Sequence, residues 1–146
     1  SEGNWIIQDL ARQILAHRFS EKLKALGRPS PKVLDRCAAP GGKSVALAWL
    51  GAEVSAADTS DVRRKILEET LARAAPSVRV LQESQIESGA PYSAVWIDAP
   101  CSGSGILRRH PDVRWLRKEA DLAGLIEIQR KLLQDAFGWV EKRGLV

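Results

Sequence analysis

The stretch CAAPGGKS, residues 37–44, constrains the fold of this chain more than any other segment. It joins a short apolar segment, KVLDRCA, to a segment of helical character, KSVALAWL. A glycine-rich turn between a strand and a helix is typical of α/β proteins, in which it carries the backbone past a bound nucleotide. The sequence therefore predicts a nucleotide-binding type of sheet whose first strand ends at this turn.

Strand-like and helix-like segments alternate along the rest of the chain. A helix is predicted within residues 5–19, with Asp9 available as its N-cap. Further helices are predicted over 60–75, closed by Pro76, and over a long segment from about Leu116 to Lys142. Further strands are predicted at residues 52–58, 78–82 and 93–100, and a fifth begins at 144–146. This alternation predicts an α/β fold with a doubly wound, mostly parallel sheet in a single domain, residues 1–146.

The composition narrows the class of protein. A hydrophobic fraction of 45% and a charged fraction of 27% are those of a soluble globular protein, and no apolar run approaches the ~20 residues that span a bilayer. Two cysteines without a signal peptide indicate free thiols in a reducing compartment, which predicts a cytoplasmic location. The net charge of +4 permits a nucleic-acid partner, and no Cys/His/Asp cluster has the spacing of a metal site.

The glycine turn has two possible interpretations. It nearly matches the phosphate-binding Walker A pattern, with Gly42, Lys43 and Ser44 in place, but Cys37 replaces the first glycine and Pro40 has no N–H to donate. The alternative is a nucleoside site, in which a carboxylate at the end of the second strand binds the ribose hydroxyls. Asp58 occupies that strand end, and we favour the nucleoside site.

A second carboxylate supports the same interpretation. The segment AVWID resembles a Walker B strand that ends in Asp98. The residues that follow, APCSGSG, place a proline and the Cys101 thiol directly after the carboxylate, and an ATPase metal site has no use for them. Asp98 and Cys101 are therefore candidates for a catalytic site.

Several long segments together resemble the Sun/Fmu-type RNA cytosine-5 methyltransferases. They are VLDRCAAPGGKS, AADTS, WIDAPCSGSGILRRHPDVRW, the helix through Gln129 and the opening WIIQD, and the resemblance covers nearly the whole chain. It points to the bacterial enzymes that act on small-subunit ribosomal RNA. The resemblance implies a Rossmann-like methyltransferase fold, S-adenosyl-L-methionine as cofactor and 5-methylcytosine in RNA as product.

The resemblance also implies roles for individual residues. The cofactor-binding residues would be Cys37, Ala38, Ala39, Pro40, Gly41, Gly42, Lys43, Asp58 and Asp98. Asp98 would contact ring nitrogen 3 of the cytosine, and Cys101 would help to release the product. The segment RRHPDVRW would contact RNA phosphates through Arg108, Arg109 and Arg114.

The chain departs from the family pattern at several positions. Arg36 replaces a usually apolar residue, and Glu83 or Ser84 stands where an acidic residue usually follows the third strand. The family's nucleophilic cysteine belongs to a Thr-Cys-Ser segment that this sequence does not contain. We therefore expect a fragment of the catalytic core, cut at its fifth strand and without the RNA-binding domain that commonly precedes it, which binds cofactor but is inactive alone.

Two alternatives to this function stay open at this stage. The first is a DNA cytosine-5 methyltransferase that uses Cys101 as nucleophile, although the residues after Cys101 differ from the usual Pro-Cys-Gln context. The second is a non-catalytic module that binds the cofactor or RNA. The oligomeric state cannot be inferred from the sequence.

Overall fold

The computed structural model describes residues 6–103, 105, 115 and 119–146. Its centre is a five-stranded sheet with the strand order β3-β2-β1-β4-β5. The strands are β1 (Lys32–Arg36), β2 (Glu53–Ala57), β3 (Arg79–Leu81), β4 (Tyr92–Ile97) and β5 (Val140–Leu145), and every pair is parallel. The chain adds β2 and β3 on one side of β1 and then adds β4 and β5 on the other side. This is the doubly wound topology predicted from the sequence.

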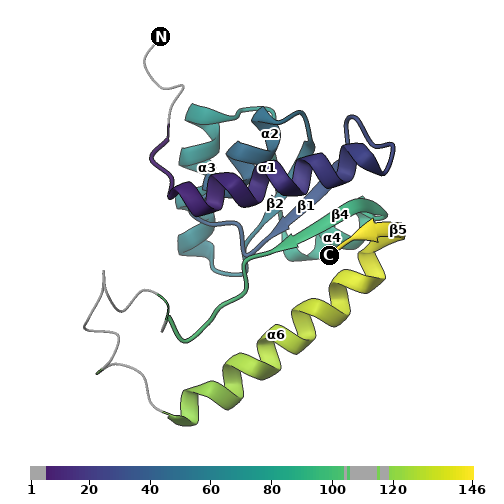
Figure 1. Cartoon of the computed structure of the whole chain (residues 1–146). Helices are drawn as coiled ribbons and strands as arrows, with labels where there is room; N and C mark the ends of the chain where they lie inside the picture. The colour runs from purple at the N-terminus through teal and green to yellow at the C-terminus, as the bar shows by residue number, and fades with distance from the viewer. Residues whose placement is uncertain (1–5, 104, 106–114, 116–118) are drawn as a thin grey trace.

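Helices cover both faces of the sheet (Figure 1). One face carries α1 (Leu10–Ala25), α2 (Gly42–Trp49) and α3 (Asp61–Ala74). The other carries the 3-10 turn η1 (Glu83–Gln85), α4 (Ile86–Gly89) and the C-terminal end of α6 (Glu119–Trp139). The short elements η1 and α4 were not predicted from the sequence.

Alternation along the strands divides the core into two layers. Val33, Ala56 and Ala94 pack with α1, α2 and α3, whereas their neighbours Leu34, Ala57 and Val95 belong to the cluster beside α4 and α6. Successive side chains of a strand point to opposite faces, so buried strands in a parallel sheet are apolar at every position. The same alternation sends Asp35 toward the face of α2 and Arg36 toward the face of α4.

Helix α1 begins after Asp9, the predicted N-cap, and continues to Ala25, beyond the predicted residue 19. The Asp9 carboxylate accepts a hydrogen bond from Ala11 N at 2.9 Å and caps the helix. The buried residues of α1 are Ala16, Ser20 and Leu23, whereas Leu10 and Ile14 are 69% and 48% exposed. The helical spacing therefore predicted the helix correctly, and Ala16, Ser20 and Leu23 form its buried face.

The long helix α6 ends earlier than the sequence predicted. It stops at Trp139 instead of Lys142, and β5 starts at Val140 instead of Gly144. Val140 pairs with Tyr92 and Leu145 pairs with Ala94, so an irregular segment with Arg143 at φ 63° separates two points of pairing. The strand pairing with β4 overrides the helical pattern there.

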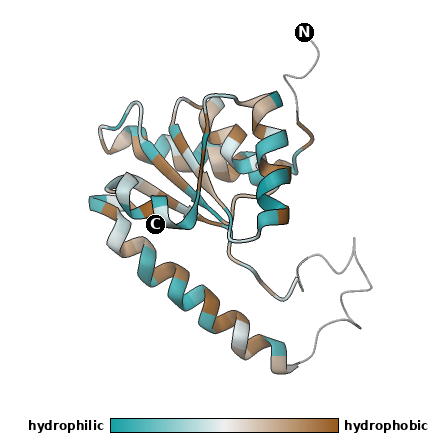
Figure 2. Cartoon of the chain, turned by 180° about the vertical axis from the view of Figure 1, so that it is seen from behind, coloured by the Kyte–Doolittle hydropathy of each residue, from teal (hydrophilic) through white to brown (hydrophobic). Residues whose placement is uncertain are grey.

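The apolar residues of α6 divide between the core and solvent. Leu132 and Ala136 are buried, but Leu122 is 45% exposed, and brown residues occur along the whole length of the helix in Figure 2. Among the described helices, none is long and apolar enough to cross a bilayer.

Candidate functional site

The turn after β1 is a compact loop that leads directly into α2. Ala38 N donates to Ala57 O at 3.0 Å, and Gly41 N donates to Ala38 O at 2.8 Å. Gly41 has φ 109°, and a Cβ at this position would lie 3.1 Å from Leu67 Cδ1 on α3. Both the backbone conformation and the close approach of α3 therefore require glycine at the entrance to α2. Cys37 also adopts a positive φ, 62°.

Asp58 lies at the end of β2, next to this loop. Its side chain is fully buried, and its oxygens accept hydrogen bonds from Ala39 N at 3.3 Å and Ser60 N at 3.1 Å. Arg63 on the first turns of α3 donates to both oxygens, through Nη2 at 2.7 and 2.9 Å and Nε at 3.0 Å. Asp58 thus contacts the loop directly through Ala39. The sequence analysis did not identify Arg63 as its partner.

Asp98 lies just beyond β4 and pairs with Lys43. Lys43 Nζ lies 2.5 Å from Asp98 Oδ2, and the lysine side chain is 15% exposed against 55% for the aspartate. Lys43 belongs to the first turn of α2, so this ion pair joins the glycine loop to the end of β4. The structure therefore brings two predicted site residues, 55 positions apart in sequence, into direct contact.

Asp35 is a buried carboxyl group beneath the loop that the sequence analysis did not select. Its Oδ2 accepts a hydrogen bond from Ser44 Oγ at 2.6 Å, and its Oδ1 has no partner within the described part of the chain. Burial raises the pKa of this carboxyl group from 3.8 to about 7, against the opposing effects of Ser44 and Lys43. The negative charges of Asp98 and Asp58 raise the same pKa further.

Arg36 and Glu83 form a third ion pair at this edge of the sheet. Arg36 is the last residue of β1, and its Nη2 donates to Glu83 Oε1. The arginine side chain is 3% exposed and the glutamate side chain is 57% exposed. Both residues were noted as departures from the family pattern, and the structure shows that they contact each other.

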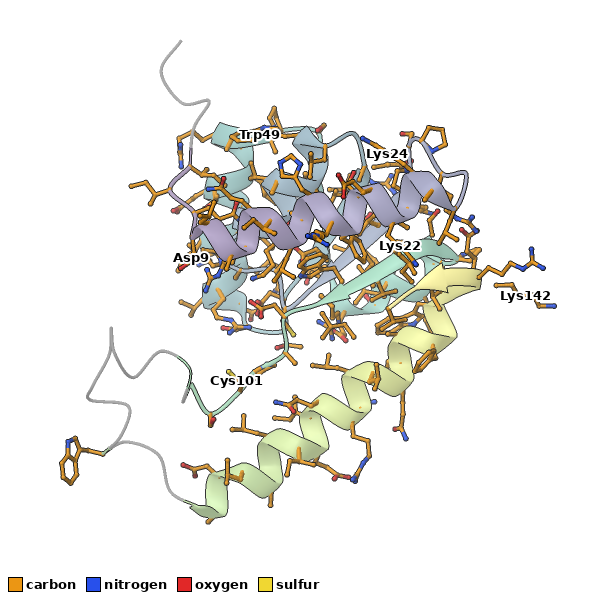
Figure 3. The ribbon with its side chains drawn as sticks, viewed as in Figure 1. Asp9, Lys22, Lys24, Trp49, Cys101 and Lys142 are labelled. Carbon is orange, nitrogen blue, oxygen red and sulfur yellow. The ribbon has the colours of Figure 1, made fainter. Side chains whose placement is uncertain are left out.

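Cys101 follows the Asp98 turn on the segment that leads from β4 toward α6 (Figure 3). It is exposed, and Gln129 Nε2 on α6 donates to Pro100 O at 2.7 Å, which ties the helix to this segment. Gln129 was noted for its place in the family pattern, and the structure gives it this contact. Arg108, Arg109 and Arg114 lie outside the described residues.

The two cysteines are expected to react with iodoacetamide at different rates. Burial raises the pKa of the partly buried Cys37 thiol, whereas Cys101 is exposed. Because the thiolate is the reactive species, Cys101 should be alkylated at least about tenfold faster at pH 8. Mass spectrometry of timed samples measures both rates, and Cys101→Ser provides the control. Faster labelling of Cys37 would contradict this description of the two thiols.

The described side chains define a site at the carboxyl ends of β1, β2, β3 and β4. Three of its carboxylates already have a cationic partner: Asp58 with Arg63, Glu83 with Arg36, and Asp98 with Lys43. No group of His, Cys, Asp and Glu side chains suited to a metal ion occurs in the described ranges. A buried carboxylate beside a glycine loop fits a nucleoside with free ribose hydroxyls.

Solved structures define the class of protein to which this fold and site belong. The chain superposes on the crystal structure of NSun6 from Pyrococcus horikoshii with SFG, an analogue of S-adenosylmethionine, with a TM-score of 0.80 and 25% identity. That match covers 99% of this chain and 37% of the other. A second structure, PH0851, matches with a TM-score of 0.78 and 28% identity over 96% of this chain and 32% of the other. The fold is that of the S-adenosylmethionine-dependent methyltransferases.

Sequence relatives then identify the family. The family described as 16S rRNA methyltransferase RsmB/F matches residues 26–146. Ribosomal RNA small subunit methyltransferase B of Shewanella oneidensis is 35% identical over 98% of this chain, and the protein of the same name in Photorhabdus laumondii is also 35% identical over 98%. The chain belongs to the RsmB/F family. It spans about a third of the length of these relatives, 34% in both cases.

Proposed function

We propose that this chain is the cofactor-binding core of an RNA (cytosine-5-)-methyltransferase that forms 5-methylcytosine in ribosomal RNA. The observation that carries the proposal is the convergence of the loop 37–43, Asp58 and Asp98 at one edge of the sheet. Asp58 would bind the ribose hydroxyls of S-adenosyl-L-methionine, and the loop 37–43 would lie along the ligand. When bound, the cofactor supplies an electrophilic methyl group.

The protein groups beyond β4 would act on the cytosine. In its protonated form Asp98 would donate a hydrogen bond to ring nitrogen 3, which is an acceptor in cytosine, and this contact would make carbon 6 easier for a thiolate to attack. Lys43 Nζ contacts Oδ2 of Asp98, so the other oxygen, Oδ1, would carry the proton that is donated to the base. Cys101, exposed just after Asp98, would assist when the proton leaves carbon 5 and the thiolate leaves carbon 6.

RNA binding is the third part of the proposal. Arg108, Arg109 and Arg114 would contact phosphates, and the net charge of +4 favours a polyanionic partner. These residues follow Cys101 closely in sequence, so phosphate contacts there would bring RNA to the catalytic residues. A ribosomal RNA substrate would place the reaction in the cytoplasm.

Binding of S-adenosylhomocysteine tests the proposal. We expect isothermal titration calorimetry to detect binding by the wild-type chain, and Asp58→Ala to weaken it by about 1–3 kcal/mol, or roughly 5- to 150-fold, because the ribose hydroxyls lose their acceptor. Asp61→Ala is the matched control, since Asp61 lies three residues away with its side chain 84% exposed.

The same titration separates the competing interpretations of the glycine loop. Equal affinities of wild type and Asp58→Ala would remove Asp58 from the ligand site. Tighter binding of ATP–Mg²⁺ than of S-adenosylhomocysteine would favour the phosphate-binding interpretation and contradict the proposed function.

A further inference from the structure

Arg36 is a buried charge whose donors are only partly used. It is 3% exposed, and its Nε and Nη1 have no hydrogen-bond partner within the described ranges. Only Nη2 is paired, with Glu83. A buried ion pair with unsatisfied donors is generally no more stable than an apolar residue of similar size. Fold stability therefore gives no reason for arginine at this position.

The position of Glu83 suggests a reason. The strand order places β4, β1, β2 and β3 side by side, with Asp98 beyond β4, Asp58 beyond β2 and Glu83 beyond β3. A nucleoside cofactor with its reacting end near Asp98 and its ribose at Asp58 would extend its base in the same direction, toward β3. Glu83 is therefore the carboxylate that lies where the base would end.

Arg36 reaches Glu83 from the opposite side of β2. The guanidinium starts on β1 and meets a carboxylate beyond β3, two strand spacings or roughly 10 Å away across the sheet. Since the arginine is buried and the glutamate is exposed, Arg36 is the fixed member of the pair. It limits the positions that the Glu83 carboxylate can adopt.

We propose that Arg36 is a positioning residue that holds Glu83 to accept the exocyclic amine of the cofactor's adenine. This inference rests on the proposed function. One oxygen of Glu83 is engaged by Arg36, which leaves the other free to accept a hydrogen bond from the amine. Arg36 and Glu83, the two departures from the family pattern, then act together, because the arginine restricts the long glutamate side chain.

Because Arg36 is buried and Glu83 is exposed, variants of the two residues should affect fold stability in opposite ways. Stability measurements can therefore distinguish a positioning role from a role in folding. Arg36→Met removes the buried charge and leaves Glu83 exposed to water, so the midpoint of thermal unfolding should be unchanged or higher. Glu83→Ala removes the acceptor but leaves the Arg36 charge buried without a partner, so the midpoint should fall. Glu87→Ala is the matched control, because Glu87 is an exposed carboxylate four residues further along.

The experiment compares two ligands by calorimetry on the 146-residue chain: S-adenosylhomocysteine and its analogue with hydrogen in place of the 6-amino group. Wild type and Glu87→Ala should prefer the amino ligand by about tenfold. Arg36→Met and Glu83→Ala should lose most of that preference, and their affinity for the deamino analogue should change less than about twofold. The selective loss is a readout that a purely structural role would not produce.

The contrary results are distinct. If wild type binds S-adenosylhomocysteine but Arg36→Met keeps the full preference for the amino ligand, the positioning role is wrong and the proposed function stands. Equal loss of affinity for both ligands in Arg36→Met would also overturn the positioning role. If wild type binds neither ligand, the proposed function fails, and this inference fails with it.

Discussion

Incubated with labelled S-adenosylmethionine and unmodified small-subunit ribosomal RNA, the 146-residue chain is expected to transfer no methyl group above background. Carbon 5 of cytosine becomes nucleophilic only after a thiolate adds to carbon 6, and loss of such a nucleophile removes most of an enzyme's rate. The sequence contains two cysteines. Burial raises the pKa of Cys37, and under the proposed function Cys101 would assist product release. Neither is expected to act as the nucleophile.

Scintillation counting of the purified RNA measures the transfer, and Cys101→Ser is the control. Robust methylation that disappears in Cys101→Ser would make Cys101 the nucleophile and favour the mechanism of the DNA enzymes. The binding titration with S-adenosylhomocysteine, run on the same preparation, shows whether an inactive sample still has an intact cofactor site.

Asp35 is expected to make the stability of the chain fall as the pH rises from about 4 to about 7. The pKa of this carboxyl group is about 7 in the folded state, against 3.8 as the ordinary value. Between these values the native state binds more protons than the unfolded state, so the free energy of unfolding decreases with pH and then levels off. The full effect is at most roughly 4 kcal/mol.

Asp35→Asn isolates this contribution, because an amide does not titrate and its oxygen can still accept the Ser44 hydrogen bond. Relative to wild type, the variant should gain stability as the pH rises from 4 to 8 in urea unfolding experiments. Asp61→Asn is the control, since the Asp61 side chain is 84% exposed and the difference from wild type should stay nearly flat. A flat difference for Asp35→Asn as well would show that Asp35 is ionised throughout.

The sequence predicted the sheet well because its strands are buried on both faces. Val33 and Leu34, or Ala94 and Val95, are adjacent apolar residues that pack against opposite layers, and such runs are hard to mistake. The end of α6 was harder to predict. Its helical spacing continues past Trp139, but pairing of Val140 with Tyr92 depends on a strand about fifty residues earlier.

The site was predicted in part for a similar reason. Asp58 and Asp98 directly follow strands, so chain position alone places them at the edge of the sheet where open α/β folds bind ligands. Their cationic partners depend on the arrangement of the folded strands and helices. Arg36 meets Glu83 across 47 positions, and no periodicity in the sequence connects the two residues. The buried Asp35 was missed because its partner, Ser44, lies on the next helix, and the sequence does not show the hydrogen bond between them.

Under the proposed function, the ligand meets two ion pairs that behave differently: a ribose would displace Arg63 from Asp58, whereas Glu83 would keep Arg36 and offer its other oxygen to the base. Arg63 is 47% exposed, so once a ribose takes its place on Asp58 the guanidinium can be hydrated at little cost. Arg36 is 3% exposed and has no such access to water. The ribose end of the proposed site would therefore yield to the ligand, whereas the base end would be rigid before the ligand arrives, and selection among nucleosides would fall to the rigid end.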